Sequence, residues 1–233
     1  MKRKYLLFLT GLTLLTLIAL PAHATVLVFN QGMDVWLSSS GTAGDGGNPN
    51  LGWGRSIGVN AKNYDTLIKF TNVFGTDPNQ IPLGSTINSA VMSMWVGYDN
   101  NDTSYIYQMT HDWNEASSWT TIGSTGGIVA GVNTEAAPEF QWTGTTDAWS
   151  QRAFDLTASV QDWSGGADQF GWGITKSRNG IVTATSLNYS TASYRPFLTV
   201  DFSPAAVVPE PASIAMMGLG LCGLFGKYHK RFI

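Results

Sequence analysis

The chain has 233 residues, of which only 12% are charged, about half of the value of about 25% that is usual for soluble domains. Glycine (26 residues) and aromatic residues (12%) are abundant, and the formal net charge is −3. Low charge with many aromatic rings excludes a disordered chain, and the scarcity of Glu, Lys, Arg and Leu excludes a coiled coil or a helical repeat protein.

The N-terminus has the features of a secretory signal peptide. Lys2, Arg3 and Lys4 precede a predominantly apolar run over residues 5–20, and small residues follow at the positions that define an Ala-x-Ala cleavage site. We expect signal peptidase to cut after Ala24. The alternative, a permanent N-terminal membrane anchor, is disfavoured because the apolar run is short and ends in small residues.

The region that follows has the periodicity of strands. Short runs rich in β-branched and aromatic residues are separated by clusters of Gly, Asn, Asp, Ser and Pro. Ala90, Met92 and Met94 would share one face of a strand, as in a sheet buried on one side. Only residues 157–163 have a helical start and a Gly-Gly stop. We therefore predict an all-β fold, an antiparallel β-sandwich or jelly roll. The expected strands are 26–29, 34–38, 56–60, 66–70, 89–98, 104–110, 151–156, 170–176, 181–189 and 197–202.

The charge of this region argues against one class of partner. Residues 25–208 contain seven basic and fifteen acidic residues, a net charge of −8. An acidic domain is a poor partner for nucleic acid, whose phosphates are bound by Lys and Arg. The one cysteine, Cys222, lies near the C-terminus, so the domain has no disulfide, no thiol nucleophile and no thiolate metal site.

Few residues are candidates for catalysis. Glu115 lies between Trp113 and Trp119, and His111 is the one histidine of residues 25–208. Glycoside hydrolysis needs a second carboxylate about 5 to 10 Å from the first, and the Gly-x-Ser-x-Gly elbow of serine hydrolases does not occur. We expect both tryptophans to fill the core and the domain to be noncatalytic. A glycoside hydrolase or polysaccharide lyase that uses Glu115, Asp112 or His111 stays open as the alternative.

No cofactor is expected, with bound calcium as an open alternative. Asp99 and Asp102 bracket two asparagines between predicted strands, and carboxylate oxygens are ligands that calcium prefers. The spacing is not that of an EF-hand, and Asn and Asp also form turns without a metal. Other acidic residues with the same ligand chemistry are Asp34, Asp45, Asp65 and Asp201.

Aromatic residues beside polar residues are the best candidates for ligand binding. The C–H faces of sugars match a flat ring, and an adjacent polar side chain matches their hydroxyl groups. Glycan binding by exposed rings is therefore the molecular activity that we expect. The candidate residues are Trp36, Trp53, Arg55, Trp95, Trp142 and Trp149.

Several motifs in a fixed order resemble the DNRLRE-domain family, which is related to disaggregatase-type modules. The resemblance spans residues 32–202 and implies a secreted β-sandwich module, some relatives of which bind polysaccharide. Lys69 stands where the family usually has an arginine, so no binding role is transferred to it. The motifs are Asp34-Val35-Trp36-Leu37, Leu51-Gly52-Trp53-Gly54, Tyr64-Asp65-Thr66-Leu67-Ile68-Lys69-Phe70, Ile81-Pro82, Asp112-Trp113-Asn114-Glu115, Phe154-Asp155-Leu156-Thr157 and Arg195-Pro196-Phe197.

The C-terminus carries a second targeting signal. Pro209, Glu210 and Pro211 precede a short apolar, Gly-rich run over residues 212–226, which we expect to form a short transmembrane helix. The chain closes with basic residues, which favour the cytoplasmic side: Lys227, Lys230 and Arg231. The order resembles the PEP-CTERM sorting signal of Gram-negative bacteria, which implies cleavage near the Pro-Glu-Pro motif by an exosortase-type transpeptidase. A plain C-terminal anchor is the alternative.

These predictions divide the chain into a signal peptide (1–24), a DNRLRE-like β-sandwich domain (25–203) and a linker with the sorting signal (204–233). We expect an exported precursor that is transiently anchored in the inner membrane and then reaches the cell surface or the extracellular matrix. There it would act as a noncatalytic, glycan-binding protein of the exopolysaccharide matrix. A purely structural matrix protein is the remaining alternative.

Overall fold

The computed structural model describes residues 24–41, 46–97, 102–122, 126–144, 149–176 and 180–205. The described residues belong to one compact unit, His23–Ala205. The signal peptide up to residue 23, the Pro-Glu-Pro motif, the apolar run and the basic end all lie outside the described residues. Within the described residues, no helix has the length and apolar character needed to cross a membrane.

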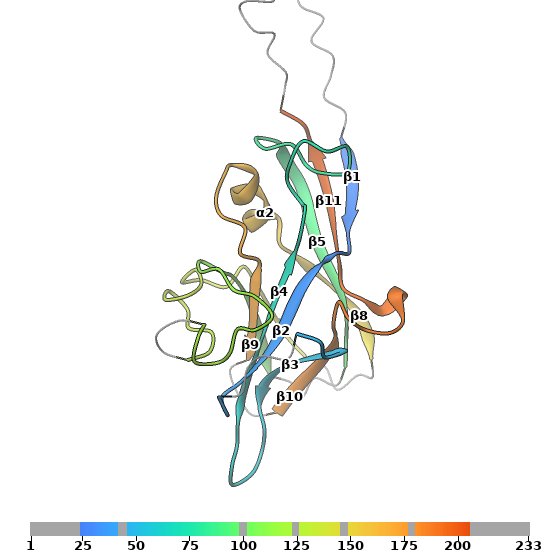
Figure 1. Ribbon diagram of the computed structural model, residues 1–233. Helices are drawn as coiled ribbons and strands as arrows, with labels where there is room; N and C mark the ends of the chain where they lie inside the picture. The colour runs from blue at the N-terminus through green and yellow to red at the C-terminus, as the bar shows by residue number, and fades with distance from the viewer. Residues whose placement is uncertain are drawn as a thin grey trace, which may run out of the picture. The chain divides into compact units, whose positions relative to one another are not determined.

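The regular secondary structure of the described unit is mostly antiparallel strand with little helix, which confirms the predicted all-β class (Figure 1). The elements in chain order are β1 (Thr25–Phe29), β2 (Gly32–Ser38), β3 (Asn50–Arg55), β4 (Asn63–Phe70), β5 (Thr86–Val96), β6 (Thr103–Gln108), β7 (Phe140–Thr143), β8 (Ser150–Asp155), α2 (Thr157–Ser164), β9 (Trp172–Lys176), β10 (Gly180–Thr185), the 3-10 turn η2 (Ala192–Tyr194) and β11 (Phe197–Ser203).

The described strands form two groups that are joined by one ribbon. β1, β11, β5 and β8 pair in that order, and β2, β4, β9, β6 and β7 form the second group. The β3–β10 pair joins them, since β10 meets β5 through Ala184 and Val96, and β3 meets β4 through Gly54 and Tyr64. Each junction is a single residue pair, so the ribbon is a narrow bridge between the two groups.

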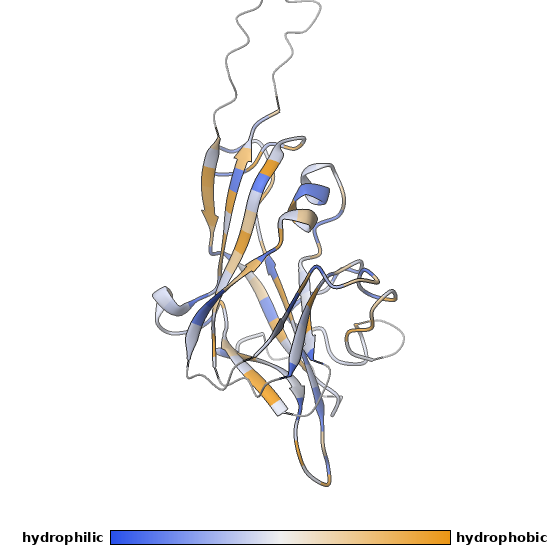
Figure 2. Ribbon diagram, turned by 180° about the vertical axis from the view of Figure 1, so that it is seen from behind, coloured by the Kyte–Doolittle hydropathy of each residue, from blue (hydrophilic) through white to orange (hydrophobic). Residues whose placement is uncertain are grey.

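Apolar residues at every second position of the strands form the main hydrophobic core. Ala90, Met92, Met94 and Val96 of β5 are fully buried, and the residues between Ala90 and Val96 are partly exposed, as predicted. Figure 2 shows the same interspersing of hydrophobic and polar residues along the long strands. The predicted helix is also confirmed, and it packs Trp163 against the main core beside β5.

A second, smaller core lies on the other face of β2 and β4. It contains Leu67 of β4, the neighbour of Ile68, which belongs to the main core. β4 is therefore buried on both faces, and the expectation of one-sided burial does not hold there. The covering segment is the long connection over residues 109–134, green in Figure 1, which contributes Trp113 and Ile122.

The structure corrects two strand predictions. The predicted strand 181–189 ends at Thr185, and a turn follows at residues 187–188. Residues 56–60 contain a bend and a turn, and the strand is the preceding segment, β3, whose glycines favour a loop in the sequence. These glycines lower strand propensity, yet Gly54 allows the close approach of β10, because a Cβ there would overlap the carbonyl oxygen of Gly180. β7 was also not predicted.

A substitution at Gly54 tests how closely the two strands of the β3–β10 ribbon approach each other. The φ of Gly54 is +111°, and a Cβ there would overlap the carbonyl oxygen of Gly180. We expect Gly54→Ala to lower the free energy of unfolding by at least about 2 kcal/mol, because a strained backbone and a backbone clash both oppose the native state. Urea unfolding followed by tryptophan fluorescence measures the change.

Gly58→Ala is the matched control, since Gly58 also has a positive φ (+130°) but a Cβ there would meet no atom within 4 Å. The control variant has the backbone strain and lacks the clash. Equal losses of stability in the two variants would contradict the close approach of β3 to β10.

Candidate functional site

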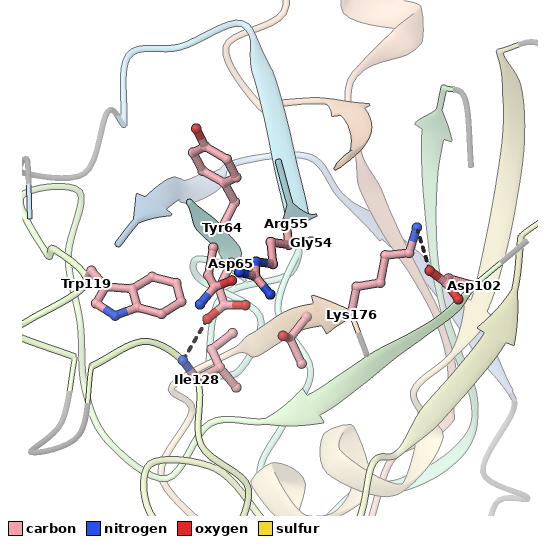
Figure 3. A pocket seen from close by; sticks show the side chains of 10 residues that line it. Gly54, Arg55, Tyr64, Asp65, Asp102, Trp119, Ile128 and Lys176 are labelled. Carbon is pink, nitrogen blue, oxygen red and sulfur yellow. Dashed lines mark hydrogen bonds and ion pairs between the residues drawn. The ribbon is translucent and has the colours of Figure 1, made fainter. Parts of the chain in front are cut away.

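A cleft with a volume of ≈ 650 Å³ opens at one end of the second strand group (Figure 3). In antiparallel strands, the end of one strand lies beside the start of the next. The ends of β3 and β9 therefore meet the starts of β4 and β6 here, and the 109–134 segment closes one side. The lining residues are Gly54, Arg55, Asn63, Tyr64, Asp65, Asp102, Trp119, Ile128, Thr175 and Lys176.

Asp65 of β4 holds the 109–134 segment, which closes one side of the cleft, against the sheet. Its buried carboxylate accepts a hydrogen bond from the Ile128 backbone N–H at 2.8 Å and another from the Thr175 hydroxyl. Burial raises the pKa of Asp65 from 3.8 to about 6, against the lowering effect of these hydrogen bonds. Gly127 has to be a glycine at this point, because a Cβ would lie 2.7 Å from the Asp65 carboxylate.

Trp119 forms one wall of the cleft. Gly126 and Gly127 pack against its ring with positive φ values, and the Gly127 N–H donates to the Trp119 carbonyl at 2.8 Å. The indole is only partly buried, against the second core on one side and the cleft on the other. The expectation that Trp119 fills the core is therefore met only in part, and the rest of the ring is available to a ligand.

The charged side chains are spread along the cleft. Figure 3 shows Trp119 at one side, Asp65 and Arg55 in the middle, and Lys176 facing Asp102 at the other side. The Lys176 Nζ lies 4.0 Å from Asp102 Oδ2. Arg55 is exposed and forms no ion pair with any residue that the structure describes. The cleft thus offers a cation and an aromatic wall, and protein donors already engage both of its carboxyl groups.

Three of the predicted ligand-binding tryptophans pack against other residues. Trp53 is 0% exposed and donates its indole N–H to the Ser104 hydroxyl at 2.9 Å. A ring buried on both faces has no surface for a sugar, so Trp53 is a core residue and not a binding platform. Trp142 is partly buried, with its ring 4.8 Å from that of Phe154. Trp36 is also partly buried and packs 5.0 Å from the ring of Tyr64.

The remaining two predicted tryptophans are more accessible. Trp95 projects from β5 on the face opposite to the core, where its ring lies 4.9 Å from that of Tyr194. Trp149 is 48% exposed. Neither lines the cleft, and of the six predicted ligand-binding residues only Arg55 does. The structure therefore does not bring the predicted set together.

The residues of the catalytic alternative lie apart from the cleft lining. Asp112 forms an ion pair with Lys69 at 2.9 Å, and this hydrogen bond is the main reason why the pKa of Asp112 lies below its usual value. Lys69 also donates to the Trp113 carbonyl at 2.7 Å and lies 4.8 Å above the Trp113 ring. Trp113 is buried, as predicted, and His111 and Glu115 are exposed. Lys69 thus anchors the 109–134 segment to β4.

Of the calcium candidates, Asp99 lies outside the described residues, and Asp102 faces Lys176. No group of three or more His, Cys, Asp or Glu side chains within the described ranges is arranged to hold a metal ion.

Sequence reasoning missed Tyr64, Asp65 and Lys176 as cleft residues. Polar residues at the first and last positions of predicted strands are the signal that points to them, since antiparallel pairing collects such positions at one edge. The predicted strand 66–70 begins two residues after Tyr64, so neither Tyr64 nor Asp65 was placed at that edge.

The pKa of Asp65 predicts a dependence of stability on pH. A carboxyl whose pKa is raised on folding binds its proton more tightly in the native state, so its contribution to stability falls as the pH rises from about 4 to about 7. Asp65→Asn keeps an oxygen acceptor for the Ile128 N–H and removes the charge. We expect it to abolish this contribution, up to about 3 kcal/mol. Urea unfolding at pH 4.5 and pH 7.5 measures the difference.

Asp168→Asn, at an exposed position, is the control for loss of one acidic residue. If wild type and Asp65→Asn lose the same stability between the two pH values, the carboxyl of Asp65 is not held in the buried site described here.

Comparison with known proteins identifies the C-terminal end of the chain. No curated protein matches the sequence. Residues 207–231 match the PEP-CTERM protein-sorting motif, which confirms the resemblance seen in the sequence. This motif indicates a secreted protein that an exosortase-type system sorts from a membrane-anchored precursor to the cell surface. The match lies outside the described domain, for which the resemblance to the DNRLRE family stays a prediction.

Proposed function

We propose that the domain is a noncatalytic module that binds polysaccharide of the cell surface or extracellular matrix in the cleft beside Trp119. The observation that carries this proposal is the combination, in one cleft of ≈ 650 Å³, of an accessible indole with an exposed guanidinium and polar side chains. Binding sites for small polar ligands commonly join such apolar surface to a few placed polar groups.

The aromatic side chains suit a sugar ring. An indole offers a flat apolar face for the C–H groups of a pyranose, and the hydroxyl of Tyr64 and the amide of Asn63 offer hydrogen bonds to its hydroxyls. Tyr64 is supported from behind by the ring of Trp36, and Trp119 by the backbone of Gly126 and Gly127. Rings held in place before the ligand arrives lose little conformational freedom on binding.

The polar residues favour binding over catalysis. Asp65 is engaged by the Ile128 N–H and the Thr175 hydroxyl, and Asp102 by Lys176. Because protein groups already hold both carboxyls, we expect neither to act as the acid or base of a glycosidase. Arg55, with five N–H donors, suits hydroxyl pairs or the carboxylate of a uronic acid.

The resemblance to the DNRLRE family supports the same proposal. It implies a β-sandwich module, and the division of the strands into two groups joined by the β3–β10 ribbon supports that architecture. Some members of that family bind polysaccharide. The sorting motif at residues 207–231 supports delivery to the compartment where such a polymer is found.

Affinity electrophoresis tests the proposal, with gels that contain neutral or uronate-bearing polysaccharides. We expect at least one polymer to retard the purified protein, and Trp119→Ala to weaken binding at least tenfold, or about 1.4 kcal/mol, because the stacking surface is lost. Arg55→Ala should weaken binding less for neutral polymers than for acidic ones. Trp149→Ala, which removes an exposed ring outside the cleft, should leave the retardation unchanged.

Two outcomes would contradict the proposal. Release of reducing ends or unsaturated uronides from the retained polymer would identify an enzyme. Absence of retardation in every gel would favour a structural matrix protein.

A further inference from the structure

The carboxyl group of Asp34 is buried without a complete set of partners. Asp34 is 0% exposed, and its Oδ2 accepts a hydrogen bond from the Leu187 backbone N–H at 2.5 Å. Its Oδ1 is buried as well and has no hydrogen-bond partner among the residues that the structure describes. Buried carboxylate oxygens are almost always paired with a donor or a metal ion, so the ionised form of Asp34 lacks a partner at Oδ1.

A second carboxylate is linked to Asp34 through a short series of contacts. Leu187 binds Asp34, and the next residue, Asn188, donates its side-chain amide to the Gly46 carbonyl at 2.6 Å. The Glu115 side chain lies against Gly46, so closely that a Cβ on Gly46 would overlap the Glu115 Cβ. Three connections of the chain therefore converge beside β2.

The electrostatics of the two carboxyl groups are unfavourable without a cation. Burial raises the pKa of Asp34 from 3.8 to about 7, the Leu187 hydrogen bond lowers it, and the charge of Glu115 raises it again. Each of the two upward effects opposes the ionised form. A positive ion between the groups would compensate for both and would supply the partner that Oδ1 lacks.

We propose that Asp34 and Glu115 bind one calcium ion between them, at a site distinct from the sugar cleft and from the predicted candidates Asp99 and Asp102. Calcium takes six to eight oxygen ligands in flexible geometry, which two carboxylates, carbonyl oxygens and water can supply. Gly46 provides one carbonyl, whose second lone pair remains after the Asn188 amide is bound. Magnesium requires a near-ideal octahedron and suits this irregular set less well.

The site would fasten the 109–134 segment to the edge of β2. Glu115 precedes Trp119 by four residues in the same segment, and Asp34 lies on a strand that pairs only with β4 among the described strands. Because only two carboxylates take part, we expect an affinity in the range of extracellular calcium modules, a Kd of about 10⁻⁴ to 10⁻³ M.

Calorimetric titration of the EDTA-treated, dialysed protein with calcium chloride tests the site. We expect one ion per chain and a rise in Tm with calcium. Glu115→Gln should weaken the affinity at least tenfold, and this exposed substitution should leave the fold intact. Asp34→Asn should have the same effect, and Asp162→Asn, on the exposed face of α2, should have none. Terbium luminescence sensitised by tryptophan reports the same binding independently.

Two results would overturn the proposal: no heat and no Tm shift at about 10 mM calcium, a concentration well above the expected Kd, or binding to Glu115→Gln as tight as to wild type. The second result would place the ion elsewhere, as at Asp99 and Asp102. The Glu115→Gln variant decides the question even if Asp34→Asn does not fold. Failure of glycan binding alone would not affect this proposal, because the metal titration contains no sugar.

Discussion

Burial of β4 on both faces organises the described domain. One face packs into the main core through Ile68, and the other packs Leu67 under the 109–134 segment. That segment has little regular secondary structure, so specific side chains hold it in place. Lys69 fixes its start through Asp112 and the Trp113 carbonyl, and Asp65 fixes its middle through the Ile128 N–H. The cleft exists because the covering segment is attached at both places.

The sequence predicts the parts of the fold that depend on local alternation. β5, β11 and α2 were predicted because their burial repeats every second residue or because they have a start and a stop signal. β3 was not, because its glycines resemble a loop and only the approach of β10 shows why they are needed. The sequence also does not predict the burial of β4 on both faces, because the second face is covered by a segment about fifty residues away that has no periodicity of its own.

The candidate site was harder to predict because the exposure of a tryptophan ring depends on residues that are far away in the sequence. Trp53 and Trp119 both follow a polar or glycine-rich stretch, and the two sequences give no sign of different burial. Trp53 lies in the main core and donates to Ser104, 51 residues away, whereas Trp119 packs against the second core on one side and lines the cleft on the other. Arg55 was predicted as a polar neighbour of Trp53, and it lines the cleft although Trp53 itself is buried elsewhere.

The indole N–H signals of a ¹⁵N-labelled protein would report whether a sugar contacts the Trp119 side of the cleft. Each tryptophan gives its own signal, which mutation of the residue identifies. On titration with an oligosaccharide of the retained polymer, we expect a saturable shift of the Trp119 signal while that of the buried Trp53 stays in place. Saturable shifts confined to Trp95 or Trp149 would place the ligand on another surface and show that the cleft is not the binding site.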